Sequence, residues 1–535
     1  MKTDLKSNQT DKEMRRQKPP LYEYQPVTAV WEITFACNMR CKHCGSGCDT
    51  FLPDELSTEE ALNLCDDIGK MGLRYLTLSG GEPFVRKDWH WLAARLRANN
   101  VIPVVISNGW FIDETIIDLA FEAGVSNIAV SLDGLKQNHD WIRKRGSFER
   151  TVHALDLMRR KNMSSSVVTA VNNKNIGELP SLRDLLIELK VDSWQVQIAV
   201  AMGNLLQNEE LIIRPQQVDT IIDFAYATNQ EEKIKVYLAD CVGYYNLKEV
   251  EIRRMHSPDP NYRGFFNGCP AGKNAFGIRC NGNITGCTSI RDDAYIEANV
   301  RDIPLPQLWK REDAFAWNRS LSKADLNGFC GQCQYGAWCL GGCTNLKITM
   351  SKSLYENRYC SFLNAAQKIF AEAAAITDPA VLSNKGKAFC ENGDYQFAQA
   401  CFARGLELVP TDTEILNYLG FIHFQMEDYK TSLDFNRRSL TIDPTSAYAL
   451  KGMGNCLVKL GQIDKGITFL KKSAESATVD FTDPFYDLAV VYYDNRRYAE
   501  GIRILDAAMQ RSQAFAEQSK PLYEMLQTAC SQTPV

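Results

Sequence analysis

The sequence lacks three features that would place it in other classes of protein. It has no uninterrupted apolar run long enough to span a bilayer, and residues 1–20 hold no apolar core of a signal peptide. Positive charge is not in excess, since the formal net charge of the 535 residues is −5, which argues against nucleic acid as a partner. These absences predict a cytoplasmic protein that binds neither membranes nor nucleic acid. Residues 1–26 are expected to form a flexible tail.

Cysteine, by contrast, is abundant. The chain has 18 cysteines, and fourteen of them lie before residue 361. A cytoplasmic chain does not normally hold its cysteines in disulfides, and clustered spacings in such a chain indicate metal binding. The length alone predicts two or three domains.

Residues 27–235 alternate short apolar segments with amphipathic ones. The expected strands are 28–34, 74–79, 102–107, 126–131, 165–171 and 194–200. Alternation of strands and helices predicts a parallel sheet with right-handed crossovers. Six such units predict an α/β fold, a partial (β/α)6 TIM-like barrel, with its chemistry at the C-terminal ends of the strands. Residues 266–360 are rich in Cys and Gly with little periodicity, so metal would have to organise them.

The C-terminal part repeats itself. Gly386, Gly420 and Gly454 are each 34 residues apart, and so are Pro410 and Pro444. This period resembles the tetratricopeptide repeat (TPR), in which paired helices stack into a solenoid with a groove. The sequence therefore predicts an all-α TPR solenoid over 378–520, preceded by a linker helix at 363–377.

The first cysteine motif directly follows the first expected strand. Cys37, Cys41 and Cys44 are spaced C-x3-C-x2-C. Three thiolates on a four-iron cluster leave one iron open for a substrate. The alternative for the triplet taken alone is a zinc site or reduced structural cysteines.

Polar residues follow the next strands as well. The second expected strand ends in Gly80, Gly81, Glu82 and Pro83. The third and fourth end in further polar groups, which are Ser107, Asn108, Ser131 and Asp133, with Arg143 shortly after them. Glycines let a backbone approach a ligand closely, and Arg suits a carboxylate. For Asn108 and Asp133, ordinary turn chemistry is an equal alternative.

Together these motifs resemble the radical S-adenosylmethionine (SAM) superfamily. The resemblance implies a [4Fe-4S] cluster held by Cys37, Cys41 and Cys44, with SAM on the open iron. It assigns Gly80, Gly81 and Glu82 to the SAM amino group. The strand-end residues Ser107, Asn108, Ser131, Asp133 and Arg143 would bind the rest of the SAM molecule. The implied reaction splits SAM reductively into methionine and a 5′-deoxyadenosyl radical, which abstracts hydrogen from a substrate; no catalytic residue is assigned.

The second cysteine field resembles the SPASM domain of radical SAM enzymes. Its cysteines are Cys269, Cys280, Cys287, Cys330, Cys333, Cys339, Cys343 and Cys360, within an expected domain 236–362. The resemblance implies two auxiliary [4Fe-4S] clusters. The first would use Cys269, Cys287 and Cys343, with Cys280 as the nearest candidate for a fourth ligand or else an open iron. The second would use Cys330, Cys333, Cys339 and Cys360. A pair of zinc knuckles is the structural alternative.

Two departures bear on the substrate. Sulfatase-maturing relatives carry Asp after the cysteine that matches Cys287, whereas this chain has Thr288, so formylglycine formation is disfavoured. The residues before the first expected strand are too few for the peptide-binding domain of many maturases, and the repeats could replace it.

These features predict an enzyme that modifies a ribosomally made peptide or protein, bound through the TPR groove and reduced by an external flavodoxin- or ferredoxin-type donor. A radical SAM enzyme acting on a tetrapyrrole or amino sugar is the alternative. A zinc-stabilised TPR scaffold is the non-enzymatic one.

Overall fold

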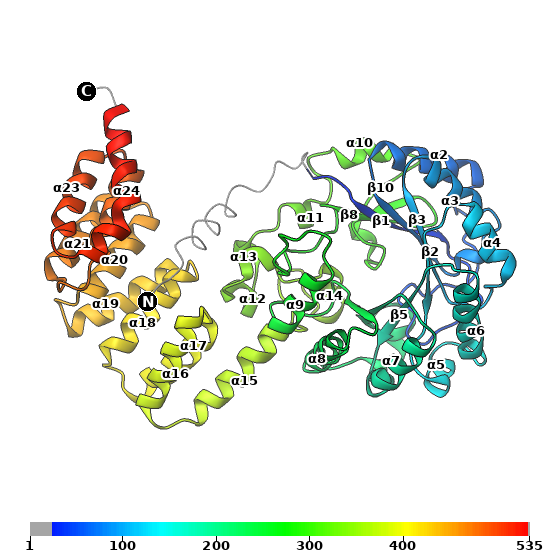
Figure 1. Ribbon diagram of the computed structural model, residues 1–535, viewed down its shortest axis with the longest axis horizontal. Helices are drawn as coiled ribbons and strands as arrows, with labels where there is room; N and C mark the ends of the chain where they lie inside the picture. Colours follow the sequence, from blue (N-terminus) through cyan, green and yellow to red (C-terminus); the bar gives the residue numbers. More distant parts are fainter. Residues whose placement is uncertain (1–23, 533–535) are drawn as a thin grey trace. The chain divides into compact units, whose positions relative to one another are not determined.

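The computed structural model describes residues 24–532, which form two compact units (Figure 1). The first unit holds the residues up to 331 together with 335–364, and the second holds 332–334 and the residues from 365 onward. Helix α15, Ser361–Ala375, lies where a linker helix was expected and crosses this division. Most of the predicted flexible tail falls outside the described residues.

One mixed sheet forms the frame of the first unit. Its strands are β1 Thr28–Thr34, β2 Tyr75–Gly80, β3 Ile102–Ser107, β4 Asn127–Ser131, β5 Ser165–Val171, β6 Ser193–Ile198, β7 Lys235–Leu238, β8 Ala275–Ile278, β9 Asn283–Thr285 and β10 Ile296–Asn299. Their order is β10-β9-β8-β1-β2-β3-β4-β5-β6-β7. The strands from β8 through β1 to β7 pair in parallel, whereas β9 is antiparallel to both neighbours. The sheet is therefore open, and the predicted partial barrel is confirmed.

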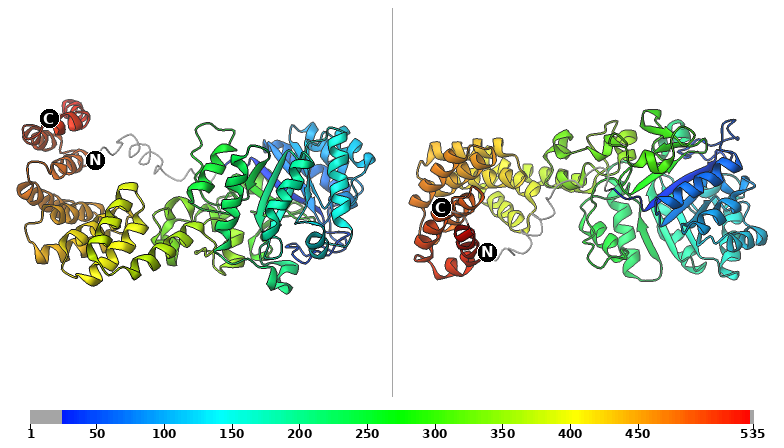
Figure 2. Two further views of the ribbon diagram at one scale, coloured as in Figure 1. Left: turned by 60° about the horizontal axis from the view of Figure 1, so that its bottom comes forward. Right: turned by 90° about the horizontal axis from the view of Figure 1, so that it is seen from above.

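Helices connect the parallel strands. They are α2 Thr58–Lys70, α3 Trp89–Ala98, α4 Glu114–Glu122, α5 Lys136–Ile142, α6 Ser147–Arg160, α7 Leu179–Glu188, α8 Gln217–Gln230 and α9 Leu247–Met255. Short helices follow in the cysteine-rich region: α10 Leu305–Trp309, α11 Ala316–Arg319, α12 Gly328–Gln332, α13 Gly336–Cys339 and α14 Thr344–Met350. Figures 1 and 2 show α2, α3, α4 and α6 along the outer side of the sheet. Helix α2 begins at Ser57 because Ser57 and Glu60 cap each other's backbone N–H groups.

The core of the barrel follows from the alternation of side chains along its strands. In β5 every second residue is buried. Trp31 of β1 and Trp194 of β6 are fully buried, and the Trp194 indole N–H donates to Thr169 Oγ1 at 2.8 Å. Apolar side chains fill the interior. The predicted polar site residues follow the C-terminal ends of parallel strands, so they lie at one edge of the sheet.

Four strands lie outside the sequence prediction, which gives only β1 to β6. β7 extends the sheet beyond β6, and β8 pairs with β1 on the opposite side, with Thr28 opposite Ala275. The cysteine-rich region is thus not organised by metal alone, because it contributes three strands to the same hydrogen-bonded sheet.

Helices alone build the second unit after α15. They are α16 Pro379–Asn392, α17 Tyr395–Leu408, α18 Thr413–Gln425, α19 Tyr429–Ile442, α20 Ala447–Lys459, α21 Ile463–Ser476, α22 Asp483–Asp494, α23 Tyr498–Met509 and α24 Gln513–Gln532 (Figure 2). Gly386 of α16 and Gly454 of α20 face the next helix so closely that an added Cβ would lie 2.7 Å from Phe402 Cζ and 2.6 Å from Leu470 Cγ. The 34-residue period therefore corresponds to one close helix pair per repeat.

Among residues 24–532 there is no helix with the length and apolar character needed to cross a bilayer.

Candidate cofactor site at the carboxyl edge of the sheet

The loop that follows β1 carries the first three cysteines. Its ends are tied together, because the Cys37 N–H donates to Asp49 O at 2.9 Å and the Asp49 N–H donates to Phe35 O at 3.2 Å. Within the loop the Cys44 N–H donates to Cys41 O at 3.1 Å. The closed loop therefore folds Cys37, Cys41 and Cys44 back onto one another at the carboxyl edge of the sheet.

The three thiols interact electrostatically with one another. Burial is the main cause that raises the pKa of Cys41 to about 12; Arg143 opposes the rise, and the neighbouring Cys44 and Cys37 contribute to it. Hydrogen bonding from the Cys48 thiol lowers the pKa of Cys44. Arg143 and Asn108 also supply N–H groups near sulfur, with Arg143 Nη1 4.0 Å from Cys41 Sγ and Asn108 Nδ2 3.9 Å from Cys37 Sγ. These N–H groups would stabilise thiolate sulfur in an iron–sulfur cluster, which offsets the effect of burial.

No three His, Cys, Asp or Glu side chains among residues 24–532 converge closely enough to share a single metal ion. A four-iron cluster makes a different demand, because each thiolate binds a different iron. The loop geometry and the sulfur-directed donors therefore fit a cluster.

The glycines after β2 are required by a close approach to this loop. Gly81 N–H donates to Thr34 O and Glu82 N–H donates to Ala36 O, both at 2.8 Å. An added Cβ would lie 2.3 Å from Thr34 O at Gly80 and 2.1 Å from Ala36 O at Gly81. Only glycine fits at these positions, so the end of β2 packs tightly against the backbone at the end of β1.

Glu82 is brought together with Ser107 and Asn108. The Ser107 hydroxyl donates to Glu82 Oε1 at 2.8 Å, and the Asn108 N–H donates to Glu82 Oε2 at 2.7 Å. The carboxyl group is fully buried. Burial raises its pKa to about 7, although the Asn108 and Ser107 hydrogen bonds act against the rise. A cationic ammonium group next to it would favour the ionised form.

Asp133 forms a second polar group with His43 and Arg143. Its Oδ2 lies 2.7 Å from His43 Nε2 and accepts from Arg143 Nε at 2.5 Å. Its Oδ1 accepts from the Ala170 N–H at 2.8 Å. These contacts occupy the carboxylate, so it fixes the Arg143 guanidinium beside Cys41. Ser131 is the last residue of β4, shortly before Asp133 in sequence, and its side chain is half-buried.

In the second cysteine field, Cys269, Cys287 and Cys343 lie together. Burial raises the pKa of Cys287, and Cys269 raises it further. Burial likewise raises the pKa of Cys343, with Cys269, Cys241 and Cys287 adding to the effect. Cys241 is therefore near these three cysteines, and it belongs to none of the predicted ligand sets. Its position outside any spacing motif gave no signal.

Cys280 lies in the turn between β8 and β9. Its thiol lies near the carboxylates Glu55, Glu32 and Asp54, which together with burial raise its pKa to about 12. The Leu56 N–H donates to Cys280 O at 2.8 Å. Cys280 therefore belongs to the surroundings of the loop after β1.

The remaining predicted ligands fall on both sides of the division between the units. Cys330, Cys339 and Cys360 belong to the first unit, and Cys333 belongs to the short segment grouped with the second. Cys330 Sγ accepts from the Asn357 N–H at 3.4 Å.

A lysine lies fully buried near these cysteines. Lys347 is 0% exposed and donates from Nζ to Leu340 O at 2.8 Å. Burial lowers the pKa of Lys347, and the thiols of Cys269, Cys339, Cys330 and Cys343 oppose this effect. The Lys347 side chain is thus near members of both sets of predicted ligands.

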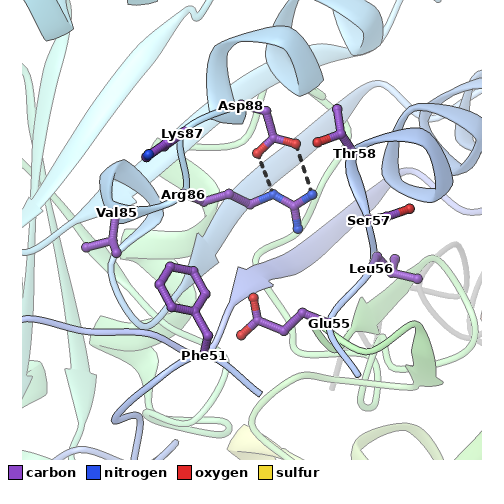
Figure 3. A pocket seen from close by; sticks show the side chains of 9 residues that line it. All are labelled: Phe51, Glu55, Leu56, Ser57, Thr58, Val85, Arg86, Lys87 and Asp88. Atoms are coloured by element: carbon purple, nitrogen blue, oxygen red, sulfur yellow. Dashed lines mark hydrogen bonds and ion pairs between the residues drawn. The ribbon is translucent and has the colours of Figure 1, made fainter. Parts of the chain in front are cut away.

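A cavity of about 410 Å³ lies behind the exit of β1 (Figure 3). Arg86 spans it and forms an ion pair with Asp88 through Nε at 2.8 Å, while its Nη1 donates to Ile33 O at 2.8 Å. Phe51, Glu55 and Lys87 also line it. None of the predicted cofactor residues lines this cavity, so the site described above is not formed there.

Comparison with known proteins identifies the class. Residues 31–186 match the radical SAM superfamily, and residues 269–334 match the SPASM iron–sulfur cluster-binding domain. The chain is therefore a radical SAM enzyme. It belongs to the radical SAM enzymes that also carry a SPASM domain. The domain pair implies SAM, a [4Fe-4S] cluster and auxiliary clusters as cofactors.

Similar proteins act on different substrates. The chain is 26% identical over 344 residues to an AdoMet-dependent heme synthase of Methanosarcina barkeri, which covers 63% of this chain and 97% of the relative. It is 26% identical over 326 residues to the mycofactocin maturase MftC of Mycobacterium ulcerans, covering 60% and 84%. The crystal structure of Streptococcus suis SuiB bound to S-adenosylmethionine shares the fold, with a TM-score of 0.51 and 16% identity over 66% of this chain and 80% of that chain.

Proposed function

We propose that this radical SAM enzyme abstracts hydrogen from a ribosomally made peptide or protein. The observation that carries the SAM site is the convergence of the Cys37–Cys44 loop with Glu82, Asn108 and Arg143 at one edge of the sheet. Support for a peptide comes from MftC, which is named a maturase, and from SuiB, which was solved with its precursor peptide.

The cofactor residues keep the roles that the sequence predicts for them. Cys37, Cys41 and Cys44 hold the cluster, which supplies, when bound and reduced, the electron for SAM cleavage. Glu82 accepts the SAM ammonium group, and its orientation is fixed by Ser107 and Asn108. Arg143 faces the SAM carboxylate, held in place by Asp133. The buried surroundings exclude water from the reacting groups.

The helical unit is proposed as a TPR array that binds the peptide or its carrier. Its regular close helix pairs support this assignment. An external flavodoxin- or ferredoxin-type protein supplies the electrons. None of the 18 cysteines is in a disulfide, which fits a reducing compartment, and we place the enzyme in the cytoplasm.

The test begins with the loaded enzyme. Reconstituted protein incubated with SAM and dithionite is expected to release 5′-deoxyadenosine, and the Cys37→Ala variant is expected to release none. Co-expression with a candidate precursor peptide, followed by mass spectrometry, is expected to show a mass change that depends on the enzyme. A fully loaded enzyme that leaves SAM intact would contradict the proposal.

A tetrapyrrole is the second candidate substrate. It is favoured by the heme synthase, which this chain matches over 97% of its length, and by a Methanosarcina barkeri Fe-coproporphyrin III synthase that is 33% identical over 205 residues, 37% of this chain and 51% of that protein. Stimulation of SAM cleavage by an iron porphyrin, without any by peptides, would select this candidate.

A further inference from the structure

The fourth ligand of the first auxiliary cluster is left open by the sequence. Cys280 is the nearest candidate, but β8 and β9 form a hairpin that separates it from the other ligands. Cys280 lies at the turn of the hairpin, whereas Cys269 precedes β8 and Cys287 follows β9 at its open end. A strand advances roughly 3.3 Å per residue, so the length of the hairpin keeps Cys280 away from both.

Burial raises the pKa of the Cys280 thiol, and the carboxylates of Glu55, Glu32 and Asp54 add to the rise. The hairpin, and not this charge, sets Cys280 apart from Cys269 and Cys287.

Cys241 occupies the required place. It follows β7, and its Sγ accepts from the Ile198 N–H at 3.4 Å, a type of hydrogen bond that stabilises ligating sulfur. The Tyr244 hydroxyl donates to Asp240 O at 2.6 Å and accepts from the Cys343 N–H at 2.9 Å. A single buried oxygen atom thus joins the residue before Cys241 to the predicted ligand Cys343.

The backbone after Cys241 is held in a strained shape. Tyr244 and Tyr245 have φ values of 83° and 61°, in the left-handed region that side chains disfavour. The backbone N–H groups of both tyrosines lie near the buried carboxylate of Glu249, which forms an ion pair with Arg253. Such strain persists only where the surrounding structure fixes it, and it is concentrated at functional sites.

We propose that Cys241 is the fourth thiolate ligand of the first auxiliary cluster, together with Cys269, Cys287 and Cys343. The assignment rests on the auxiliary clusters of the SPASM domain and not on the substrate. Four cysteine ligands leave no open iron at this cluster. The substrate would therefore not bind iron there, and the chemistry that the cluster would supply is electron transfer.

The test isolates the auxiliary clusters and uses Cys280 as the matched control. In a background in which Cys37, Cys41 and Cys44 are all replaced by Ala, the reconstituted chain is expected to hold about eight irons, the sum of two four-iron clusters. Cys241→Ala is expected to lose up to half of this iron or to change the electron paramagnetic resonance (EPR) spectrum of one cluster. Cys280→Ala is expected to retain both the iron and the spectrum.

A conservative variant guards against misfolding. Cys241→Ser keeps the size of the side chain and offers oxygen in place of sulfur, so it is expected to keep the circular dichroism of the parent while shifting the EPR signal and the potential of one cluster. Parent-like iron and spectra in both Cys241 variants would overturn the assignment. Release of 5′-deoxyadenosine by the enzyme with Cys37, Cys41 and Cys44 intact tests the proposed function separately.

A second inference comes from a different surface, where cations gather around two tryptophans. Lys42 and Lys174 lie over the Trp141 ring, with their Nζ atoms 4.8 Å and 4.6 Å from its centre. Lys144 Nζ and Arg150 Cζ lie 4.1 Å and 5.2 Å from the centre of the Trp110 ring. Trp141 is 41% exposed.

This surface carries unneutralised positive charge. Among residues 24–532 none of these four cations forms an ion pair with a carboxylate. Arg145, which is exposed, adds a fifth cation close by in sequence. The chain as a whole has a net charge of −5, so this local cluster of positive charge differs from the rest of the chain.

The cation surface lies directly on the loop that carries Cys37, Cys41 and Cys44. The Lys42 N–H donates to Ile142 O at 2.8 Å, next to Trp141. Lys144 Nζ donates to Asn38 O at 3.2 Å. On the other tryptophan, the Trp110 N–H donates to Asn108 Oδ1 at 3.0 Å, and the same Asn108 lies beside Cys37.

We infer that this cation surface docks an acidic one-electron carrier protein. Charge complementarity steers such partners and gives brief, salt-sensitive complexes, and an exposed tryptophan supplies contact area at the centre. The location keeps the electron path to the cluster short. Nucleic acid would also be attracted by cations, but it delivers no electron.

The test compares two reductants. In Arg145→Glu/Arg150→Glu/Lys174→Glu, SAM cleavage driven by reduced flavodoxin at low salt is expected to fall roughly 10-fold or more, while cleavage driven by dithionite stays at the parent rate. The matched control reverses three exposed lysines elsewhere, Lys310, Lys459 and Lys471, and is expected to retain both rates. In the parent, the flavodoxin-driven rate is expected to fall as salt is added.

Two results would overturn the inference. One is an equal flavodoxin-driven rate in the triple variant and the control. The other is a loss of the dithionite-driven rate as well, which would assign the surface to folding or to substrate binding. Retention of a short oligonucleotide by the parent, with flavodoxin-driven cleavage unaffected, would assign it to nucleic acid.

Discussion

At the scale of single residues, two buried ionisable side chains stand out because both lie among predicted cofactor ligands. Glu82 is fully buried beside the Cys37 loop, and Lys347 is fully buried beside the second cysteine field. Burial shifts the pKa of each toward its neutral form. Each is held there by hydrogen bonds that fix its position.

Glu82 makes stability depend on pH. Its ordinary pKa of 4.5 is raised to about 7, so between these values the folded state keeps a proton that the unfolded state releases. The free energy of unfolding therefore falls as pH rises from about 5 to about 7, by up to about 3 kcal/mol, and levels off above. Urea unfolding of the metal-free parent and of Glu82→Gln at pH 5 to 8 is expected to show this loss in the parent alone. Parallel pH profiles would contradict it.

Lys347 is expected to raise the reduction potential of the auxiliary clusters. A buried positive charge stabilises the more negative, reduced form of a nearby cluster. Lys347→Met should keep the iron content and lower the potential of at least one auxiliary cluster in an EPR-monitored redox titration. Lys310→Met, at an exposed position, serves as the control. An unchanged potential in Lys347→Met would show that the charge is compensated.

At the scale of elements, the end of β2 packs closely against the end of β1. Gly81 is needed there because a Cβ would lie 2.1 Å from Ala36 O. Gly81→Ala is expected to displace the Cys37 loop, reducing iron at the SAM cluster and 5′-deoxyadenosine release together. Gly177→Ala, where a Cβ would meet nothing within 4 Å, should leave both unchanged. Parent-like iron in Gly81→Ala would mean that the loop adapts.

The sequence predicted β1 to β6 closely, because each combines a short apolar run with a helix-forming segment after it. It did not predict β7 or β8 to β10, which have three or four residues each. Such short strands carry little periodic signal and exist because of their partners in the sheet. Cys241 was missed for a related reason. Its approach to Cys343 depends on contacts across about a hundred residues, which spacing motifs do not encode.

At the scale of the whole molecule, the two units are expected to divide the work between chemistry and recognition. Removal of the residues after Thr377 should leave SAM cleavage with dithionite near the parent rate, because every predicted SAM ligand lies in the first unit. Modification of the native peptide should fall sharply. Iron content measured on the same truncated chain controls for damage to the clusters. Undiminished peptide modification would show that the helical unit is not needed for recognition.

The pairing of β8 with β1 also bears on protein engineering. Strands from the cysteine-rich region complete the edge of the barrel. The auxiliary-cluster region therefore cannot be exchanged as an independent domain. A chimaera that takes this region from a relative must import a strand that matches Thr28–Trp31 in register. Chimaeras with a junction between the barrel and β8 are expected to leave the edge of β1 unpaired and to aggregate.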